Sequence, residues 1–293
     1  MESVESILIF FEKGKRAEND ARNKIRESIL EKIQDIPEIY KEDAVYGEKW
    51  KTLEKEWKSI LDTLKEKTNL PDYTRYEIQM KGGRRFHYDA ELLFYNEVEC
   101  VGSRKIEFKY GGKSVKTIPQ FLSLRANNEY FDVGYDEYYY DTHLQMYLDC
   151  DPELKDIPIS KEEYLKYVKQ IDYSKHILFQ KLKERESMNK SFKNAVINSS
   201  IKKYLEIYSD TFQLEKFKEK LKETQGEKYY FIWSNGKFTY DAMDCSDEIK
   251  LGSIVKGNVL EVEGCDLVYR LLLRWRNHKG ILNPALQISV RSK

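Results

Sequence analysis

Two short segments carry acidic and basic side chains whose spacing suits phosphodiester chemistry. Residues 86–95 alternate between apolar and polar types, so a β-strand there places Asp89 on its polar face. Residues 105–110 alternate in the same way, with Glu107 and Lys109 on the polar face. A loop centred near Val98 sets Asp89 directly opposite Glu107. Two carboxylates facing each other across antiparallel strands repel, so the pattern predicts a cation between them.

The chemistry expected of such a site is metal-assisted hydrolysis of phosphodiester bonds. Mg²⁺ is bound by hard oxygens, often one or two carboxylates, and keeps several waters. A metal of this kind polarises the phosphate and acidifies a bound water. Lys109 beside it would orient that water and stabilise developing negative charge. We therefore expect Mg²⁺ as cofactor, with Mn²⁺ as a substitute. The competing interpretation is a solvated strand face with an ordinary salt bridge.

The same residues resemble a known nuclease motif. Tyr88-Asp89 followed by Glu107-Phe108-Lys109 is similar to the motif of the PD-(D/E)XK superfamily, with Tyr88 in place of its proline. The runs RKIEFKYGG, IPQFLSL, YDEYYYD and LLLRWRNHKGILNPALQISV also resemble uncharacterised nuclease-fold proteins of large DNA viruses. The resemblance implies a restriction-endonuclease-like fold. It implies metal ligation by Asp89, Glu107 and the Phe108 carbonyl, with Lys109 assisting the nucleophile.

Five further residues are candidates for the site. Gln120 follows Ile118-Pro119, where we expect a helix to begin, and some related nucleases place a glutamine of that helix near the scissile phosphate. Glu91 and His87 share the face of Asp89, and Glu91 is a competing metal ligand. Glu54 and Glu56 lie on the helix before the strands, where some relatives contribute a metal-binding carboxylate. A solvated helix surface is the alternative for this pair.

The charge pattern indicates where DNA would bind. The last predicted hairpin carries basic side chains suited to phosphate contacts, namely Arg270, Arg274, Arg276 and Lys279. Residues 161–222 hold 15 lysines and arginines against nine acidic residues, and they would either line a DNA channel or form a solvated surface. Residues 129–158 hold nine carboxylates against one lysine, so they cannot face DNA. Their tyrosines are instead expected to pack on the body of the protein.

Four segments are expected to position these residues. The apolar spacing of Trp50, Leu53, Trp57, Ile60, Leu61 and Leu64 predicts a helix that packs on a sheet. Gly82-Gly83, Asn235-Gly236 and His278-Lys279-Gly280 are typical of hairpin turns. The expected layout is N-terminal helices at 1–70, core strands with the catalytic motif at 71–128, an acidic segment and basic helical insertion at 129–225, and C-terminal hairpins completing the sheet at 226–293. The fold class is α/β, with a central mixed sheet flanked by helices.

Composition narrows the class of protein. Of the 293 residues 34% are charged, with a net charge of zero, and 13% are aromatic. Such aromatic content argues against a disordered chain, and the charge balance argues against a polycation. No apolar run is long enough for a membrane span or a signal-peptide core. Four scattered cysteines lack a CxxC pair, which favours reduced thiols inside the cell, in cytoplasm or nucleus, rather than a secreted protein.

The sequence thus predicts a Mg²⁺-dependent endonuclease that cuts double-stranded DNA, of a restriction-like type. One alternative is a recombination or repair nuclease that recognises DNA structure. Another is a nuclease-fold protein that binds DNA or a protein without cutting. Gly-rich phosphate loops, HExxH and Ser/His/Asp arrangements are absent from the sequence, which removes support for kinases, zinc proteases and hydrolases. A homodimer stays open as the assembly, and no membrane partner is expected.

Overall fold

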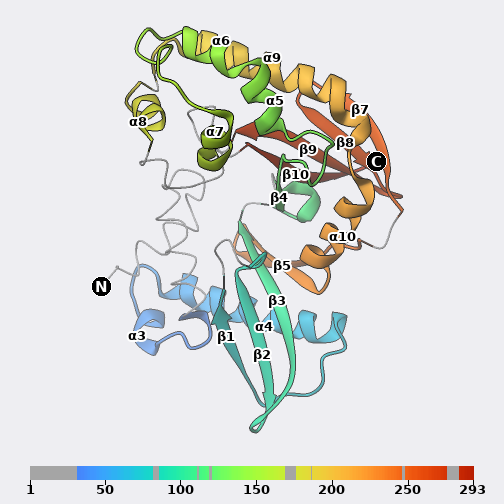
Figure 1. Cartoon of the computed structure of the whole chain (residues 1–293). Coiled ribbons are helices and arrows are strands. Elements are labelled where there is room, and N and C mark those ends of the chain that lie inside the picture. The colour runs from blue at the N-terminus through green and yellow to red at the C-terminus, as the bar shows by residue number, and fades with distance from the viewer. Residues whose placement is uncertain are drawn as a thin grey trace. The chain divides into compact units, whose positions relative to one another are not determined.

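A computed structural model describes residues 32–81, 86–110, 112–118, 121–168, 176–185, 187–245, 248–275 and 284–293 (Figure 1). The chain divides into two compact units. Unit 1 comprises Met1–Ile118 and Glu223–Cys245, and unit 2 comprises Pro119–Lys222 and Ser246–Lys293. The chain therefore passes between the units three times. Each unit contains its own sheet.

Unit 1 is a mixed five-stranded sheet with the strand order β1-β2-β3-β5-β6. Strands β1, β2 and β3 form an antiparallel meander, β5 pairs in parallel with β3, and β6 pairs antiparallel with β5. Its elements are α3 (Glu38–Lys41), α4 (Gly47–Lys67), β1 (Arg75–Met80), β2 (Ala90–Asn96), β3 (Glu99–Tyr110), η1 (Val115–Thr117), β5 (Lys228–Ser234) and β6 (Lys237–Ala242).

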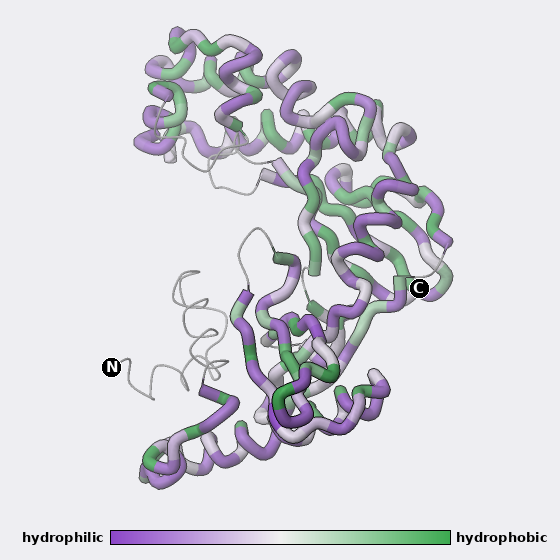
Figure 2. The backbone as a smooth tube through the Cα atoms, turned by 60° about the horizontal axis from the view of Figure 1, so that its bottom comes forward, coloured by the Kyte–Doolittle hydropathy of each residue, from purple (hydrophilic) through white to green (hydrophobic). Residues whose placement is uncertain are grey.

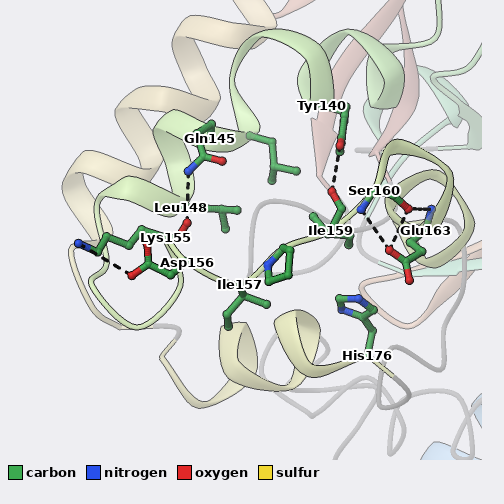
Figure 3. A pocket seen from close by; sticks show the side chains of 12 residues that line it. Tyr140, Gln145, Leu148, Lys155, Asp156, Ile157, Ile159, Ser160, Glu163 and His176 are labelled. Carbon is green, nitrogen blue, oxygen red and sulfur yellow. Dashed lines mark hydrogen bonds and ion pairs between the residues drawn. The ribbon is translucent and has the colours of Figure 1, made fainter.

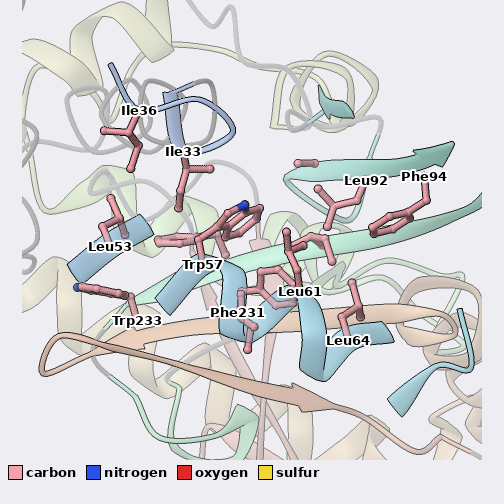
Figure 4. Close-up of a cluster of buried hydrophobic side chains, with 14 of the residues drawn as sticks. Ile33, Ile36, Leu53, Trp57, Leu61, Leu64, Leu92, Phe94, Phe231 and Trp233 are labelled. Atoms are coloured by element: carbon pink, nitrogen blue, oxygen red, sulfur yellow. The ribbon is translucent and has the colours of Figure 1, made fainter. Parts of the chain in front are cut away.

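Helix α4 covers one face of this sheet (Figure 4). All six residues of the predicted apolar stripe are buried, so the expected helix and its sheet-facing side are confirmed. Trp57 lies at the centre, where its ring meets Phe231 edge-on with centroids 5.5 Å apart. Its indole N–H donates to the hydroxyl of Tyr76 at 2.8 Å. Because α4 takes the apolar face, Glu91 of β2 and Glu107 and Lys109 of β3 lie on the opposite face.

The turn between β5 and β6 is the predicted one. Asn235 and Gly236 both have positive φ, 52° and 75°, which suits a two-residue hairpin. Strand β6 then forms the edge of the sheet. Its residues are exposed or half-buried throughout, which is typical of an edge strand. The hairpin therefore ends this sheet.

Unit 2 is built on an antiparallel five-stranded sheet with the order β4-β10-β9-β8-β7. Its strands are β4 (Leu122–Arg125), β7 (Lys250–Val255), β8 (Val259–Glu263), β9 (Leu267–Trp275) and β10 (Pro284–Ser292). Its helices are α5 (Tyr135–Thr142), α6 (Leu144–Asp149), α7 (Lys161–Val168), α8 (Ile177–Glu184), α9 (Lys190–Tyr208), η3 (Ser209–Thr211) and the greater part of α10 (Leu214–Gln225).

Tyrosines of the acidic segment pack unit 2 together, as expected. The ring of Tyr135 lies 5.4 Å from Trp275 of β9 and 5.1 Å from Tyr204 of α9. Its hydroxyl is 2.7 Å from the hydroxyl of Ser200. Burial raises the pKa of the Tyr135 phenol far above its ordinary value, so the hydroxyl stays protonated. The acidic segment therefore contributes a buried aromatic residue to the core of unit 2.

Unit 2 also encloses an ionic cluster centred on Asp151, which is fully buried. Both carboxylate oxygens accept from Nε of Arg185 at 2.8 Å, and Nζ of Lys193 lies 3.6 Å away. The N–H of Glu153 donates to the same carboxylate at 3.2 Å. Burial alone would raise the pKa of Asp151, but these hydrogen bonds and charges lower it below its ordinary value.

Two expectations about the layout are wrong. The C-terminal hairpins do not all complete one sheet, because only β5 and β6 join unit 1. The later strands bury their apolar faces against helices of unit 2, as the contact of Phe217 with Tyr269 shows. The segment after Gln120 forms strand β4 and not a helix, because it pairs with β10.

Several expectations lie outside the described residues, namely residues 1–31, Gln120 and the turns at Gly82-Gly83 and 278–280. Within the described residues no helix has the length and apolar character to cross a bilayer. Hydrophilic and hydrophobic stretches instead alternate along the helices and strands (Figure 2). All four cysteines are present as thiols.

Candidate functional site

Asp89 lies directly before β2, beside the part of β3 that carries Glu107. The register of the two strands ends with the pair of Ala90 and Ile106. The N–H of Asp89 donates to the carbonyl of that same Ile106 at 2.9 Å, so the regular ladder does not continue to a pair of Asp89 with Glu107. A bulge between Phe94 and Tyr95 shifts the register at the other end of the strand pair. The direct facing of Asp89 and Glu107 stays a prediction.

The Asp89 side chain is anchored to the neighbouring strand. Its Oδ2 accepts a hydrogen bond from the N–H of Phe108 at 2.9 Å, and Asp89 is only 6% exposed. The side chain of Phe108 belongs to the core under α4. The backbone of Phe108 thus holds the carboxylate of Asp89 in place, while its ring anchors β3 in the core. The predicted role of the Phe108 carbonyl as a metal ligand stays a prediction.

Glu107 stands between two lysines. Its Oε1 accepts a hydrogen bond from the ammonium group of Lys109. Its Oε2 lies 3.9 Å from Nζ of Lys228 on β5. The side chain of Lys109 is 24% exposed and that of Glu107 is 12% exposed, so Lys109 lies on the solvent side of the carboxylate. The ammonium group of Lys228 is thus a second positive charge beside the predicted trio of Asp89, Glu107 and Lys109.

Lys228 is the site residue that sequence reasoning missed. It opens β5 and pairs with Lys105 across the parallel strands, which places its side chain on the face of Glu107. The side chain is 1% exposed. Its Nζ donates to the carbonyl of His87 at 2.9 Å and lies 5.0 Å from the centroid of the Tyr230 ring. The signal in the sequence was a lysine at the start of the apolar run KYYFIW.

The electrostatics of Lys228 reflect this burial. Burial lowers the pKa of its ammonium group to about 8, and attraction to Glu107 and Asp89 offsets part of that effect. A group with that pKa is mainly charged at pH 7. Because a buried ammonium is costly unless it is paired, the two carboxylates and Lys228 stabilise one another.

A hydrogen-bonded pair closes the site on the side of β5. Tyr230 is fully buried and lies opposite Glu107 in the register. Its hydroxyl donates to Oε1 of Gln225, and Nε2 of Gln225 donates to Thr224 at 3.1 Å. Burial raises the pKa of Tyr230 far above its ordinary value, so it remains a neutral phenol. The glutamine that the structure brings to this region is Gln225, at the end of α10.

The remaining acidic candidates have other partners. Glu91 lies 3.4 Å from Nζ of Lys81, which directly follows β1. Glu54 pairs with Lys41 at 3.0 Å, and Glu56 accepts from the N–H of Phe238 at 3.2 Å. Both of these glutamates belong to α4, which covers the sheet face opposite Asp89. They tie the helix to its neighbours. The side chain of His87 is exposed, and its backbone carbonyl accepts the hydrogen bond from Lys228.

The donor set suits a hard cation that needs few protein ligands. Among the described residues no group of three or more His, Cys, Asp or Glu is arranged to hold a metal ion. Zinc sites need three or four such ligands, so the site does not fit zinc. Mg²⁺ is held through one or two carboxylates and keeps its waters. Asp89 and Glu107 are compatible with that smaller requirement.

The predicted DNA-binding arginines lie on the outer face of the sheet of unit 2. Arg270 is engaged by Glu261, with Nε 3.4 Å from the carboxylate. Arg274 is exposed and donates to Gln287 at 3.3 Å. Arg125 on β4, which the sequence analysis did not select, shares this face because Arg125 and Arg274 both pair with Ala285 of β10. Arg276 and Lys279 lie outside the described residues.

Unit 2 also holds a cavity of about 800 Å³ between α5, α6 and the 155–160 segment (Figure 3). Its polar groups largely satisfy one another. The hydroxyl of Tyr140 donates to the carbonyl of Ile159 at 2.9 Å, and Glu163 accepts from the hydroxyl of Ser160 at 2.8 Å. His176 accepts from the N–H of Leu178 at 3.2 Å. No set of charges converges there as it does around Glu107.

Comparison of the chain with protein-family models, with curated proteins and with solved structures finds no match. Any function assigned to the chain therefore rests on its own residues.

Proposed function

We propose that the chain is a Mg²⁺-dependent endonuclease acting on double-stranded DNA, with a restriction-endonuclease-like core in unit 1. The observation that carries the proposal is the placement of Asp89 beside β3, hydrogen-bonded to the backbone of Ile106 and Phe108 on either side of Glu107, with Lys109 hydrogen-bonded to Glu107. The mixed sheet flanked by α4 supports it, since an Asp before one strand and Glu-x-Lys in the paired strand is the arrangement of PD-(D/E)XK nucleases.

In this proposal each residue has a separate task. Asp89 and Glu107 hold the cation, and the hydrogen bond from Phe108 keeps Asp89 aligned with β3. Bound Mg²⁺ would supply charge neutralisation at the phosphate and a more acidic water. Lys109, on the solvent side of Glu107, orients the attacking water and stabilises negative charge as it develops on the phosphate.

Phosphate contacts are proposed for the outer face of the sheet of unit 2. Arg125 and Arg274 flank Ala285, whose small side chain leaves both guanidinium groups accessible. Arginines position a nucleic acid through its phosphates without reading sequence. Arg276 and Lys279 stay predicted members of this surface.

One observation favours a second candidate, a non-catalytic nuclease-fold protein. Two carboxylates and two lysines balance in charge, so the cluster can be stable as a purely structural group. The two candidates differ in one measurable property, which is metal-dependent cutting.

The test is incubation of the purified chain with supercoiled plasmid, with Mg²⁺ or with EDTA. The proposal expects nicked and linear products with Mg²⁺, none with EDTA, and none from the Asp89→Asn/Glu107→Gln double variant. Discrete fragments indicate a restriction-like enzyme. Cutting confined to junctions or ends indicates a structure-specific repair nuclease. Intact plasmid in every lane, for a folded protein over a range of DNA sequences and structures, supports the non-catalytic protein.

A further inference from the structure

Each carboxylate oxygen of Glu107 lies near the ammonium group of one lysine. One of the two lysines is accessible to solvent and the other is enclosed. Lys109 meets Oε1 from the solvent side, and its side chain is 24% exposed. Lys228 lies 3.9 Å from Oε2, and its side chain is 1% exposed. A side chain that is enclosed so completely cannot swing into solvent to make room for another ion. The two lysines are therefore not equivalent.

We propose that this site takes a single divalent cation, because the ammonium group of Lys228 permanently fills the position beside Oε2 of Glu107 where a second one would bind. The inference rests on the proposed function, since it concerns the metal on which that function depends. It goes further in assigning the number of ions and the residue that sets it.

Contacts on three sides hold Lys228 in place. Its Nζ donates to the carbonyl of His87 at 2.9 Å, lies against the ring of Tyr230 at 5.0 Å, and faces Glu107. His87 lies two residues before Asp89. The ammonium group of Lys228 therefore links the segment that leads to Asp89 with the carboxylate of Glu107. Moving it would break the hydrogen bond at His87 and expose Tyr230, which is fully buried.

The charge balance leads to the same number. Two carboxylates carry two negative charges, and Lys109 and Lys228 carry two positive ones. One divalent cation leaves the site with a surplus of two positive charges, which suits a phosphodiester that gains negative charge as it reacts. In two-metal sites the ions lie about 3.5–4 Å apart and share carboxylates. A second ion here would meet the ammonium of Lys228 within a few ångströms in a region that water screens poorly.

The experiment counts Mn²⁺ ions by electron paramagnetic resonance of the unbound ion, with the full-length chain and no DNA. Some ions bind elsewhere, for example at exposed carboxylates of residues 129–158. To correct for them, we subtract the number of ions that the Asp89→Asn/Glu107→Gln double variant binds. The variants are Lys228→Met, which removes the charge, and Lys228→Gln, which removes the charge but keeps a donor for His87. Lys105→Met is the matched control, because Lys105 pairs with Lys228 in the register but is 37% exposed at its side chain.

The expected result is one site-specific Mn²⁺ in the wild-type chain and in Lys105→Met, and two in folded Lys228→Met or Lys228→Gln. Two site-specific ions in the wild-type chain overturn the inference without use of any variant. A single ion in the folded Lys228 variants also overturns it, because Lys228 then does not set the number.

The inference and the proposed function fail in different ways. If the wild-type chain binds two site-specific ions and cuts plasmid with Mg²⁺, the proposed single ion is wrong but the proposed nuclease function stands. No site-specific ion in the wild-type chain, together with uncut plasmid, overturns both.

Discussion

Each unit of the molecule buries a carboxylate among two cations, but the two clusters differ in how completely the acid is satisfied. In unit 2, Asp151 receives Arg185 on both oxygens, Lys193 nearby and a backbone N–H as well. In unit 1, two carboxylates that repel each other share Lys109 and Lys228.

The difference suggests what separates a structural charge cluster from the one for which we propose reactivity. Asp151, just after α6, accepts hydrogen bonds from Arg185 at the end of α8 and from the backbone of Glu153, and it forms an ion pair with Lys193 of α9. In unit 1 the hydrogen bonds of Asp89 to the backbone of Ile106 and Phe108 hold it beside Glu107, and Lys109 and Lys228 balance the two like charges. Burial is common to both clusters. The difference is that Asp151 alone faces two cations, whereas Asp89 and Glu107 share two.

The largest expected effect is on the stability of unit 2. Asp151→Asn keeps the shape of the side chain but leaves Arg185 and the buried Lys193 facing a neutral amide. Breaking a buried ion pair in this way costs about 3–5 kcal/mol in the free energy of unfolding. Chemical denaturation measures it, with Asp156→Asn as control, since Asp156 is exposed and its pairing with Lys155 is worth about 0–1 kcal/mol. Equal losses in both variants would contradict the structural role of Asp151.

The next effect is on cleavage and not on folding. Glu107→Gln keeps the shape but removes the ligand charge, so Mg²⁺ should bind less tightly and cleavage should fall by more than ~10²-fold. Metal titration and single-turnover cleavage measure the two quantities. Glu91→Gln is the control, because Glu91 has its own partner in Lys81. Should Glu91→Gln abolish cleavage while Glu107→Gln does not, Glu91 is the ligand.

Lys109→Ala separates catalysis from metal binding. It leaves both carboxylates intact and removes a positive charge that opposes the cation, so metal affinity should hold or rise. Cleavage should still fall by ~10²–10³-fold, because a contact to the developing charge is lost. The same two assays apply. Near-wild-type cleavage by this variant would reduce Lys109 to a partner in an ordinary salt bridge.

A smaller effect is the pH dependence of stability in the metal-free protein. Folding lowers the pKa of Lys228 to about 8, whereas an unfolded lysine has a pKa near its ordinary value of about 10.4. Between these values the unfolded chain binds more protons, so stability rises with pH, by at most ~1.4 kcal/mol per pH unit. The wild-type free energy of unfolding should therefore rise relative to that of Lys228→Met from pH 8 to pH 10. A constant difference would show that Lys228 is not desolvated.

The smallest expected effect is on the salt dependence of DNA binding through two solvent-exposed arginines. Replacing Arg125 and Arg274 with alanine should lower the dependence of DNA affinity on salt by about one unit of slope each, because each releases about one counterion on binding a phosphate. Binding measured at several salt concentrations tests this. Arg270→Ala should change the slope less, since Glu261 already engages that arginine. An unchanged slope in the double variant would remove this face from the DNA surface.

The sequence was sufficient where the pattern is local. Alternation within residues 86–95 and 105–110, with a loop between them, led to the correct antiparallel pairing of β2 with β3. The spacing of the α4 stripe predicted its buried side, because a helix repeats every 3.6 residues.

The sequence was insufficient where a neighbour comes from far along the chain. Lys228 reaches Glu107 through a parallel strand pair, and no spacing in the sequence encodes which strands become parallel neighbours. The separate sheet of unit 2 was missed for the same reason. Alternation shows that β9 and β10 form a hairpin, but the sheet that the hairpin joins depends on the helices available to cover it.

The parallel pairing of β3 with β5 has a consequence for the order of events during synthesis. Parallel neighbours need a crossover, and here the crossover contains residues 119–222 of unit 2. A ribosome delivers Glu107 long before Lys228, so a nascent chain first presents β3 without its later neighbour β5 and without the second ammonium. Pairings between distant segments form slowly, because the closure of long loops is costly. The charge cluster of unit 1 is therefore completed only when most of the polypeptide has left the ribosome.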